Sequence, residues 1–141
     1  MTGPGLIPEL DVRDLARSLE FYVKLVGFRI SFERPEERFA YVVLNDAHLM
    51  LEEAAGPGRR FRTAPLEHPY GRGVNLQINV ADAAALHARI LAAGLVPYLP
   101  LEERWYRQNR VENGGRQFVI ADPDGYLLRF HTGLGQRPAQ G

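Results

Sequence analysis

The chain carries two copies of one sequence pattern, and this duplication limits its possible folds more than any other feature. Segment 10–14 (Leu-Asp-Val-Arg-Asp) matches segment 78–82 (Ile-Asn-Val-Ala-Asp), and segment 41–52 resembles segment 118–129. Two copies are too few for a solenoid. We therefore predict two similar modules that form a pseudo-symmetric pair, whose shared cleft is the natural place for a ligand.

The first copy is expected to begin with a strand and a helix. Residues 7–12 alternate between apolar and polar side chains, which is typical of a strand with one buried face. Asp14 is a suitable N-cap for the helix that follows, and Gly27 can end that helix in a left-handed conformation. We expect three further strands, at about 28–34, 39–44 and 48–53.

The second copy repeats this order of elements. Apolar residues alternate with polar amides from Asn75 to Val80, Asp82 is expected to cap a helix, and Gly94 to end it. Strands are expected near 95–99, 116–121 and 126–131. Each copy therefore reads as a βαβββ module of an α+β protein.

The remaining segments break the periodic patterns. Prolines and glycines interrupt 54–73, which we interpret as a stiff linker, and 100–115 reads as a long loop of the kind that is commonly functional. The residues after Thr132 are expected to form a frayed tail. The chain, 1–141, is thus predicted to be one domain made of module one at 6–53, a linker at 54–73, module two at 74–132 and a tail at 133–141.

Composition excludes several classes of partner. The chain has 17 basic and 17 acidic side chains, so no charge excess points to nucleic acid or to an anionic membrane. No window approaches the ~20 apolar residues of a membrane span, and no signal peptide is recognisable. The sequence has no cysteine, which excludes disulfides and thiolate ligands, and a cytoplasmic location is expected.

Each predicted sheet has an apolar face for its helix and a second, more polar face. The helix is expected to cover Leu10 and Val12 in the first module. The opposite faces carry Ile7, Glu9, Asp11, Asn75, Gln77 and Asn79. Such a polar face is either solvated or lines a wet cavity between two curled sheets, and the duplication favours the cavity.

Two segments of the sequence, 14–28 and 122–128, resemble the glyoxalase/bleomycin-resistance group, the vicinal oxygen chelate superfamily. Within that superfamily, 48–58 and 122–130 are most similar to the bleomycin-binding resistance proteins. The resemblance implies two tandem βαβββ modules that form a cupped sheet. It also implies a homodimer, in which the first module of one chain closes a cup with the second module of the other.

Enzymes of this superfamily hold a metal through four His or Glu ligands, and the duplication locates the equivalent positions here. They fall at Ile7, Glu52, Asn75 and Arg129. Isoleucine has no lone pair and arginine is a cation, so too few donors remain for a metal ion that needs about three or four. We therefore expect no metal, no cofactor and no catalytic residue, with the Arg129 guanidinium taking the place of the cation beside Glu52.

A bleomycin-type ligand offers a flat bithiazole, a cationic tail and a large polar head, so its site needs aromatic faces and many polar groups. The family's stacking aromatic aligns with Tyr41. Relatives tend to have Trp where this chain has Asn113, and Trp105 is a candidate replacement. Gly114 and Gly115 are expected to let the backbone approach the ligand closely. The full set of expected ligand-binding residues is Phe32, Phe39, Tyr41, Glu52, Asn75, Gln77, Trp105, Asn113, Gly114, Gly115 and Arg129, with Tyr106 a further stacking candidate.

The leading functional hypothesis is a metal-free binding protein that sequesters a bleomycin-like glycopeptide antibiotic and confers resistance without chemistry. Two alternatives stay open. One is a metal-dependent enzyme of the superfamily, such as a glyoxalase, a dioxygenase or a thiol transferase. The other is a protein that binds another aromatic small molecule.

Overall fold

The computed structural model describes residues 3–140, which divide into two compact units. Unit 1 contains residues up to 72 and the turn 122–125, and unit 2 contains 73–121 and the residues from 126 onward. Unit 1 thus takes in most of the residues predicted as a linker together with the turn 122–125. The predicted boundaries of the modules stay predictions.

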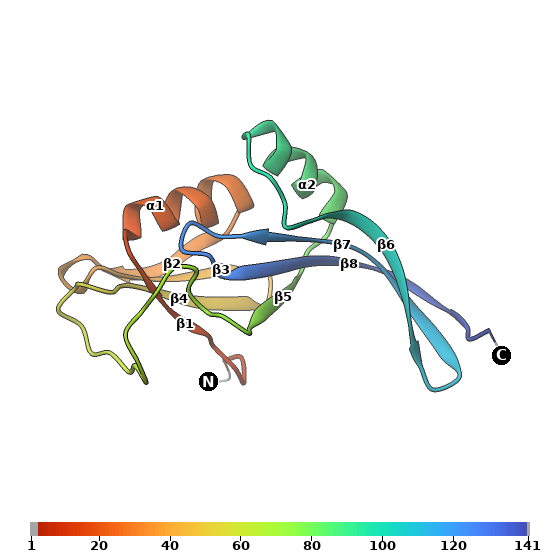
Figure 1. Cartoon of the computed structure of the whole chain (residues 1–141), viewed down its shortest axis with the longest axis horizontal. Helices are drawn as coiled ribbons and strands as arrows, with labels where there is room; N and C mark the ends of the chain where they lie inside the picture. Colours follow the sequence, from red (N-terminus) through yellow and green to blue (C-terminus); the bar gives the residue numbers. More distant parts are fainter. Residues whose placement is uncertain (1–2, 141) are drawn as a thin grey trace. The chain divides into compact units, whose positions relative to one another are not determined.

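Unit 1 is a four-stranded sheet with a helix on one face (Figure 1). The strand order is β1-β4-β3-β2, with β1 parallel to β4 and the other neighbours antiparallel. Its elements are β1 (Glu9–Val12), α1 (Leu15–Leu19), the π-helical continuation η1 (Glu20–Val26), β2 (Arg29–Arg34), the 3-10 turn η2 (Pro35–Glu37), β3 (Phe39–Leu44) and β4 (Ala47–Glu53).

Local sequence signals fix the ends of the first helix. The Asp14 carboxylate accepts a hydrogen bond from the Arg17 backbone N–H at 3.2 Å, as an N-cap should. Gly27 ends the helix with φ at 107°, which a side chain would strain. The helix packs Phe21, Tyr22 and Val26 against the sheet face that carries Leu10, Val12 and Leu51.

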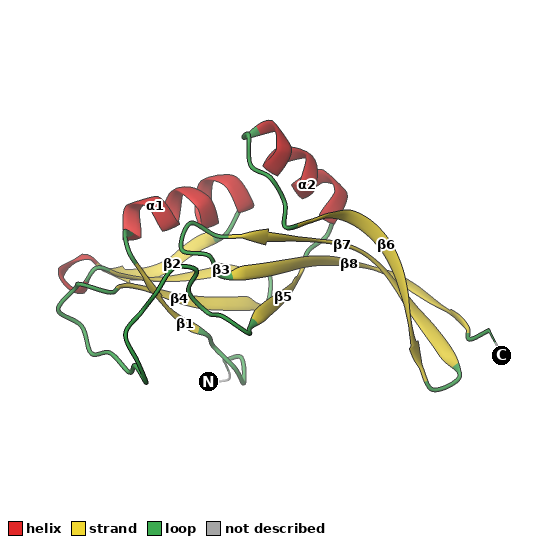
Figure 2. Ribbon diagram, in the orientation of Figure 1, coloured by secondary structure: helices red, strands yellow, loops and turns green. Residues whose placement is uncertain are grey.

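Unit 2 repeats the same topology, with strand order β5-β8-β7-β6 and β5 parallel to β8 (Figure 2). Its elements are β5 (Asn75–Asn79), α2 (Ala83–Ala92), β6 (Leu99–Gln108), β7 (Val111–Ala121) and β8 (Leu127–Pro138). The Asp82 side chain caps α2 by accepting from the Ala85 N–H at 3.0 Å. The predicted α+β fold of two tandem βαβββ modules is therefore confirmed.

Three predictions about the second module are wrong. Residues 95–98 do not form a strand, because β6 begins only at Leu99. The segment 100–115 is not a loop, because β6 and β7 form a long hairpin that turns at Asn109, where φ is 59°. Residues 133–138 are not a frayed tail, because they extend β8 and pair with β7 as far as Val111. These strands alternate charged residues, aromatic residues and glycine, so they lack the apolar alternation from which strands are predicted.

Across residues 3–140, no helix is long and apolar enough to cross a membrane.

Candidate functional site

The face of the first sheet that lies opposite α1 carries an aromatic cluster. Phe39, Tyr41 and Val43 alternate along β3, and Ile7 and Met50 pack against them. Phe32 on the neighbouring strand stacks on Tyr41, with 4.9 Å between ring centroids and 22° between the planes. The three aromatic residues expected on this strand pair therefore lie together.

The two stacked rings differ in exposure. Tyr41 is buried and its hydroxyl group lies 2.7 Å from His48 Nδ1, which fixes the orientation of its ring. Phe32 is 45% exposed on the edge strand. The Arg34 guanidinium covers the Phe39 ring at 4.1 Å from its centroid. Phe32 is thus the aromatic residue of this cluster that presents a ring to solvent.

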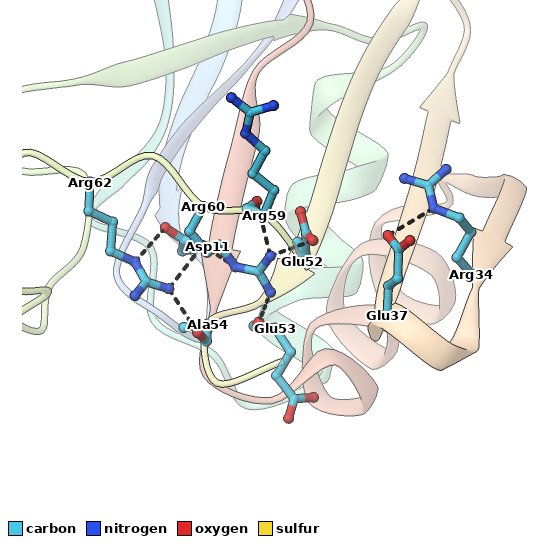
Figure 3. A network of polar contacts seen from close by, with 9 residues as sticks. All are labelled: Asp11, Arg34, Glu37, Glu52, Glu53, Ala54, Arg59, Arg60 and Arg62. Carbon is cyan, nitrogen blue, oxygen red and sulfur yellow. Dashed lines mark hydrogen bonds and ion pairs between the residues drawn. The ribbon is translucent and has the colours of Figure 1, made fainter. Parts of the chain in front are cut away.

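A second group on the same face consists of charged side chains. Asp11 lies opposite Glu52 in the pairing of β1 with β4, and Glu52 is buried. The guanidinium of Arg60, from the linker, forms an ion pair with Glu52 and lies 3.1 Å from Asp11 (Figure 3). Sequence reasoning missed Arg60, because its contact depends on how the linker folds back over the sheet.

Further contacts hold the linker on these carboxylates. Arg60 also donates to the Glu53 carbonyl oxygen, and Arg62 contacts Asp11 and the Ala54 carbonyl oxygen (Figure 3). The Arg60 Nε–H has no hydrogen-bond partner within the described residues, so its 3.1 Å approach to Asp11 is an ionic contact and not a directed hydrogen bond.

The acidic side chains influence one another. Partial burial, followed by a hydrogen bond to Glu52 and repulsion from the Glu52 and Asp11 carboxylates, raises the pKa of Glu9, and the charge of Arg60 opposes this effect. The three carboxylates of Glu9, Asp11 and Glu52 outnumber the guanidinium groups of Arg60 and Arg62 that contact them. Glu9 itself is exposed.

Glu52 and Arg129, the expected partners, belong to different units, so their partnership stays a prediction. Within unit 1, the ion pair of Glu52 is with Arg60. A guanidinium therefore stands beside Glu52, but it comes from a residue that the sequence did not single out.

The linker also encloses a hollow that was not foreseen. A cavity of about 480 Å³ lies among residues 61–72 and reaches Asp11, with Leu66 and Tyr70 in its wall. The sequence predicted only a stiff linker here. The cavity could not be predicted, because irregular backbone forms its walls and has no sequence periodicity.

The face of the second sheet opposite α2 is polar. Gln77 lies opposite Arg129, and Asn75 lies opposite Leu127. The pKa of His131 on this face is lowered by burial and then by the charge of Arg129, which favours the neutral imidazole. Gln117, which sequence reasoning did not single out, is 3% exposed.

The two glycines of β7 leave room for side chains of the protein itself. A Cβ atom on Gly114 would lie 2.6 Å from the Trp105 ring, and one on Gly115 would collide with the His131 ring. Trp105 is also covered by the Arg137 guanidinium at 4.1 Å, and Asn113 donates to Gln108 at 2.6 Å. The rings of Trp105 and His131 thus occupy the space above Gly114 and Gly115. The two glycines were expected to let a ligand approach the backbone, but here they make room for the protein's own side chains. Their contact with a ligand stays a prediction.

The residues at the four expected metal-ligand positions do not fit a metal ion. Ile7 packs in the aromatic cluster, Asn75 is exposed, and the single carboxylate, Glu52, is paired with a guanidinium. No group of three or more His, Asp or Glu side chains within residues 3–140 is arranged to hold a metal.

Comparison with known proteins agrees with this topology. Proteins named "Bleomycin resistance protein" from Geobacillus stearothermophilus and Staphylococcus aureus are 28% identical to the chain over 131 residues, which are 88% of this chain and 92% of theirs. TioX from Micromonospora sp. ML1 shares the fold with a TM-score of 0.73 at 22% identity, over 94% of this chain and 100% of its own. Virulence protein STM3117 from Salmonella typhimurium gives 0.69 at 16% identity, over 94% and 98%.

A family model also matches most of the chain. It covers residues 8–130, which contain every helix and strand except the end of β8. The chain belongs to the Glyoxalase/Bleomycin resistance protein/Dioxygenase superfamily.

Proposed function

We propose that this protein binds a bleomycin-type glycopeptide antibiotic without a metal of its own and without chemical change. The observation that carries the proposal is the Arg60 guanidinium on Glu52, because it neutralises the only carboxylate among the expected metal ligands. An arginine in that place repels a divalent cation. The similarity to proteins named as bleomycin resistance proteins supports the choice of ligand.

The aromatic cluster supports the same ligand class. Phe32 offers an accessible ring, and the buried Tyr41 holds it from behind. Offset stacking of a flat ligand ring on such a platform contributes about 0.5–1.5 kcal/mol beyond the burial of area. The exposed Glu9 carboxylate lies on the same sheet face and is suited to a cationic tail.

The second candidate is a binding protein for another flat aromatic molecule. It is favoured by Asn113, a half-buried amide bonded to Gln108, which cannot stack where the bleomycin-binding relatives tend to have Trp. Both candidates use the same aromatic cluster, so only the identity of the ligand separates them.

Isothermal titration of EDTA-treated protein with metal-free and with copper-loaded bleomycin tests the proposal. Submicromolar binding at one ligand per chain, about −8 kcal/mol or better, is expected for both forms. The Phe32→Ala variant should bind about fivefold to tenfold more weakly, and Ile30→Ala, an exposed apolar residue on the same strand, should bind like the wild type. Titrations without heat or saturation would contradict the proposal.

We infer further that the protein acts as a homodimer, as the family resemblance implies. Leu6 of unit 1 and Val96 of unit 2 are 80% and 85% exposed, so apolar side chains are available for such a contact. Sedimentation equilibrium should give twice the chain mass of 15.9 kDa, and a value equal to one chain at micromolar concentration would contradict the dimer.

A further inference from the structure

Gln117 places a fixed hydrogen-bond acceptor on the face of the second sheet opposite α2. Its Nε2 donates to the Glu102 carboxylate at 3.1 Å and to the Tyr106 hydroxyl oxygen at 2.8 Å. Because a carboxylate only accepts, the amide cannot be turned the other way without losing the bond to Glu102. The Gln117 Oε1 atom is buried and has no donor within the described residues.

Arg129 places an unpartnered donor on the same sheet face. Its Nε atom is buried and has no acceptor among residues 3–140. Arg129 and His131 alternate along β8, and the strand pairing puts His131 opposite Gln117 and Arg129 opposite Val119. The two unpartnered atoms therefore come from neighbouring rows of the same sheet face.

Buried polar atoms without partners are rare in folded proteins because each one costs about 1–3 kcal/mol. Here one atom is an acceptor and the other a donor, and they occur on one sheet face. A ligand group that satisfies both must offer a donor to Gln117 and an acceptor to Arg129, as the N–H and the carbonyl oxygen of an amide do.

The charges of the surroundings favour a neutral group. Glu102 and Arg129 contribute opposite charges, and the Arg104 guanidinium lies over the Tyr106 ring, 5.7 Å from its centroid. Burial together with the charge of Arg129 lowers the pKa of His131. A carboxylate would satisfy Arg129 but would place an oxygen against Gln117 Oε1 and a negative charge near Glu102. A cationic amidine would satisfy Gln117 but would place its N–H groups against Arg129.

We propose that this face is a subsite for a neutral carboxamide-type group, a primary carboxamide, carbamoyl or ureido group, which donates to Gln117 Oε1 and accepts from Arg129 Nε. The inference deepens the proposed binding function and rests on it for the ligand as a whole. The carboxamide subsite would receive an amide of the polar head.

Three small probes of equal shape test the subsite without the antibiotic: benzamide, benzoate and benzamidine. They share one ring and differ only in the neutral, anionic or cationic group that they carry. NMR titration of the wild-type protein should show saturable shifts of the Gln117 side-chain NH₂ and Arg129 Nε–H signals with benzamide. Benzoate and benzamidine should bind at least about tenfold more weakly, which corresponds to about 1.4 kcal/mol.

Substitutions locate the effect. Gln117→Leu should remove the preference for benzamide over the two charged probes. Gln136→Leu, the same change at an exposed position of β8 outside the subsite, should leave it intact. If Gln117→Leu does not fold, the preference of the wild-type protein for benzamide over benzoate and benzamidine still tests the subsite. Equal affinity for the three probes, or shifts that avoid Gln117 and Arg129, would overturn the subsite.

Parallel titration with bleomycin separates the two proposals. Selective benzamide binding by a protein that does not bind bleomycin would leave the subsite standing and reject the antibiotic as ligand. Bleomycin binding without any preference for benzamide would reject the subsite alone.

Discussion

Arg60 is the ion partner of Glu52, and the linker delivers it to a sheet face where Asp11 adds a second carboxylate. Both members of the pair are largely buried, with side-chain exposures of 11% for Arg60 and 6% for Glu52. A buried pair of this kind contributes little relative to apolar residues of similar volume, but removing one member leaves an uncompensated charge.

Arg60→Leu is therefore expected to lower the free energy of unfolding by about 3–5 kcal/mol, because the buried Glu52 carboxylate loses its cation. The double variant Arg60→Leu/Glu52→Leu should recover most of this loss. Arg62→Leu is the matched control, since Arg62 is more exposed and reaches only Asp11 and a backbone carbonyl, and it should cost less than about 1 kcal/mol. Urea denaturation measures all three, and a similar loss in the single and double variants would contradict the pairing.

The Tyr22 hydroxyl group donates a buried hydrogen bond of 2.6 Å to the Asp122 carboxylate. Tyr22→Phe removes this donor without changing the packing of the ring, and hydrogen bonds to charged groups contribute about 1.5–3 kcal/mol. We expect a loss of about 2 kcal/mol in urea denaturation. The same change at Tyr98, whose side chain is largely exposed, should change the stability by less than about 0.5 kcal/mol.

Gly114 accommodates the only tryptophan of the chain, so its environment can be followed by fluorescence. The methyl group of Gly114→Ala would collide with the Trp105 ring, which must move away from β7 and from Arg137. The emission maximum should shift to longer wavelength as the indole becomes more exposed. Gly133→Ala adds a methyl group in open space and should leave the spectrum unchanged. An unshifted spectrum for Gly114→Ala would show that the ring does not lie over this glycine.

Features set by local chemistry could be predicted from the sequence. The caps Asp14 and Asp82 and the left-handed Gly27 depend on neighbouring residues only, and the structure has all three. The extension of β8 beyond Thr132 could not be predicted, because its glycines and charges acquire strand structure only by pairing with β7. The Arg60–Glu52 contact joins the linker to a sheet face, which no local pattern encodes.

The same distinction explains why the aromatic cluster was easier to predict than the polar subsite. Phe39 and Tyr41 alternate along one strand, so their shared face follows from the period of a strand. In the sequence, nothing distinguishes Gln117 from any other polar residue beside an apolar segment. Its importance depends on Glu102 and Tyr106, which come from a strand that the sequence did not reveal.

His131 gives the protein a predictable dependence of stability on pH. Burial and then the charge of Arg129 lower its pKa below the ordinary value of 6.5, so the unfolded chain binds a proton more readily than the folded protein. The contribution of His131 to the free energy of unfolding therefore increases with pH between the pKa of the folded protein and about 6.5, the pKa of the unfolded chain. Acidification through the same range removes this contribution. His131→Gln should flatten that part of the stability profile in urea melts between pH 5 and 7.5.

The contribution of Arg129 to this effect can be separated by NMR. Arg129→Met removes the neighbouring positive charge but leaves the burial, so the pKa of His131 should rise part of the way toward 6.5. An unchanged imidazole titration in Arg129→Met would assign the whole shift to burial. A wild-type His131 that titrates at or above 6.5 would contradict the buried, neutral imidazole beside Arg129, and with it the preference for a neutral ligand group inferred beside Gln117.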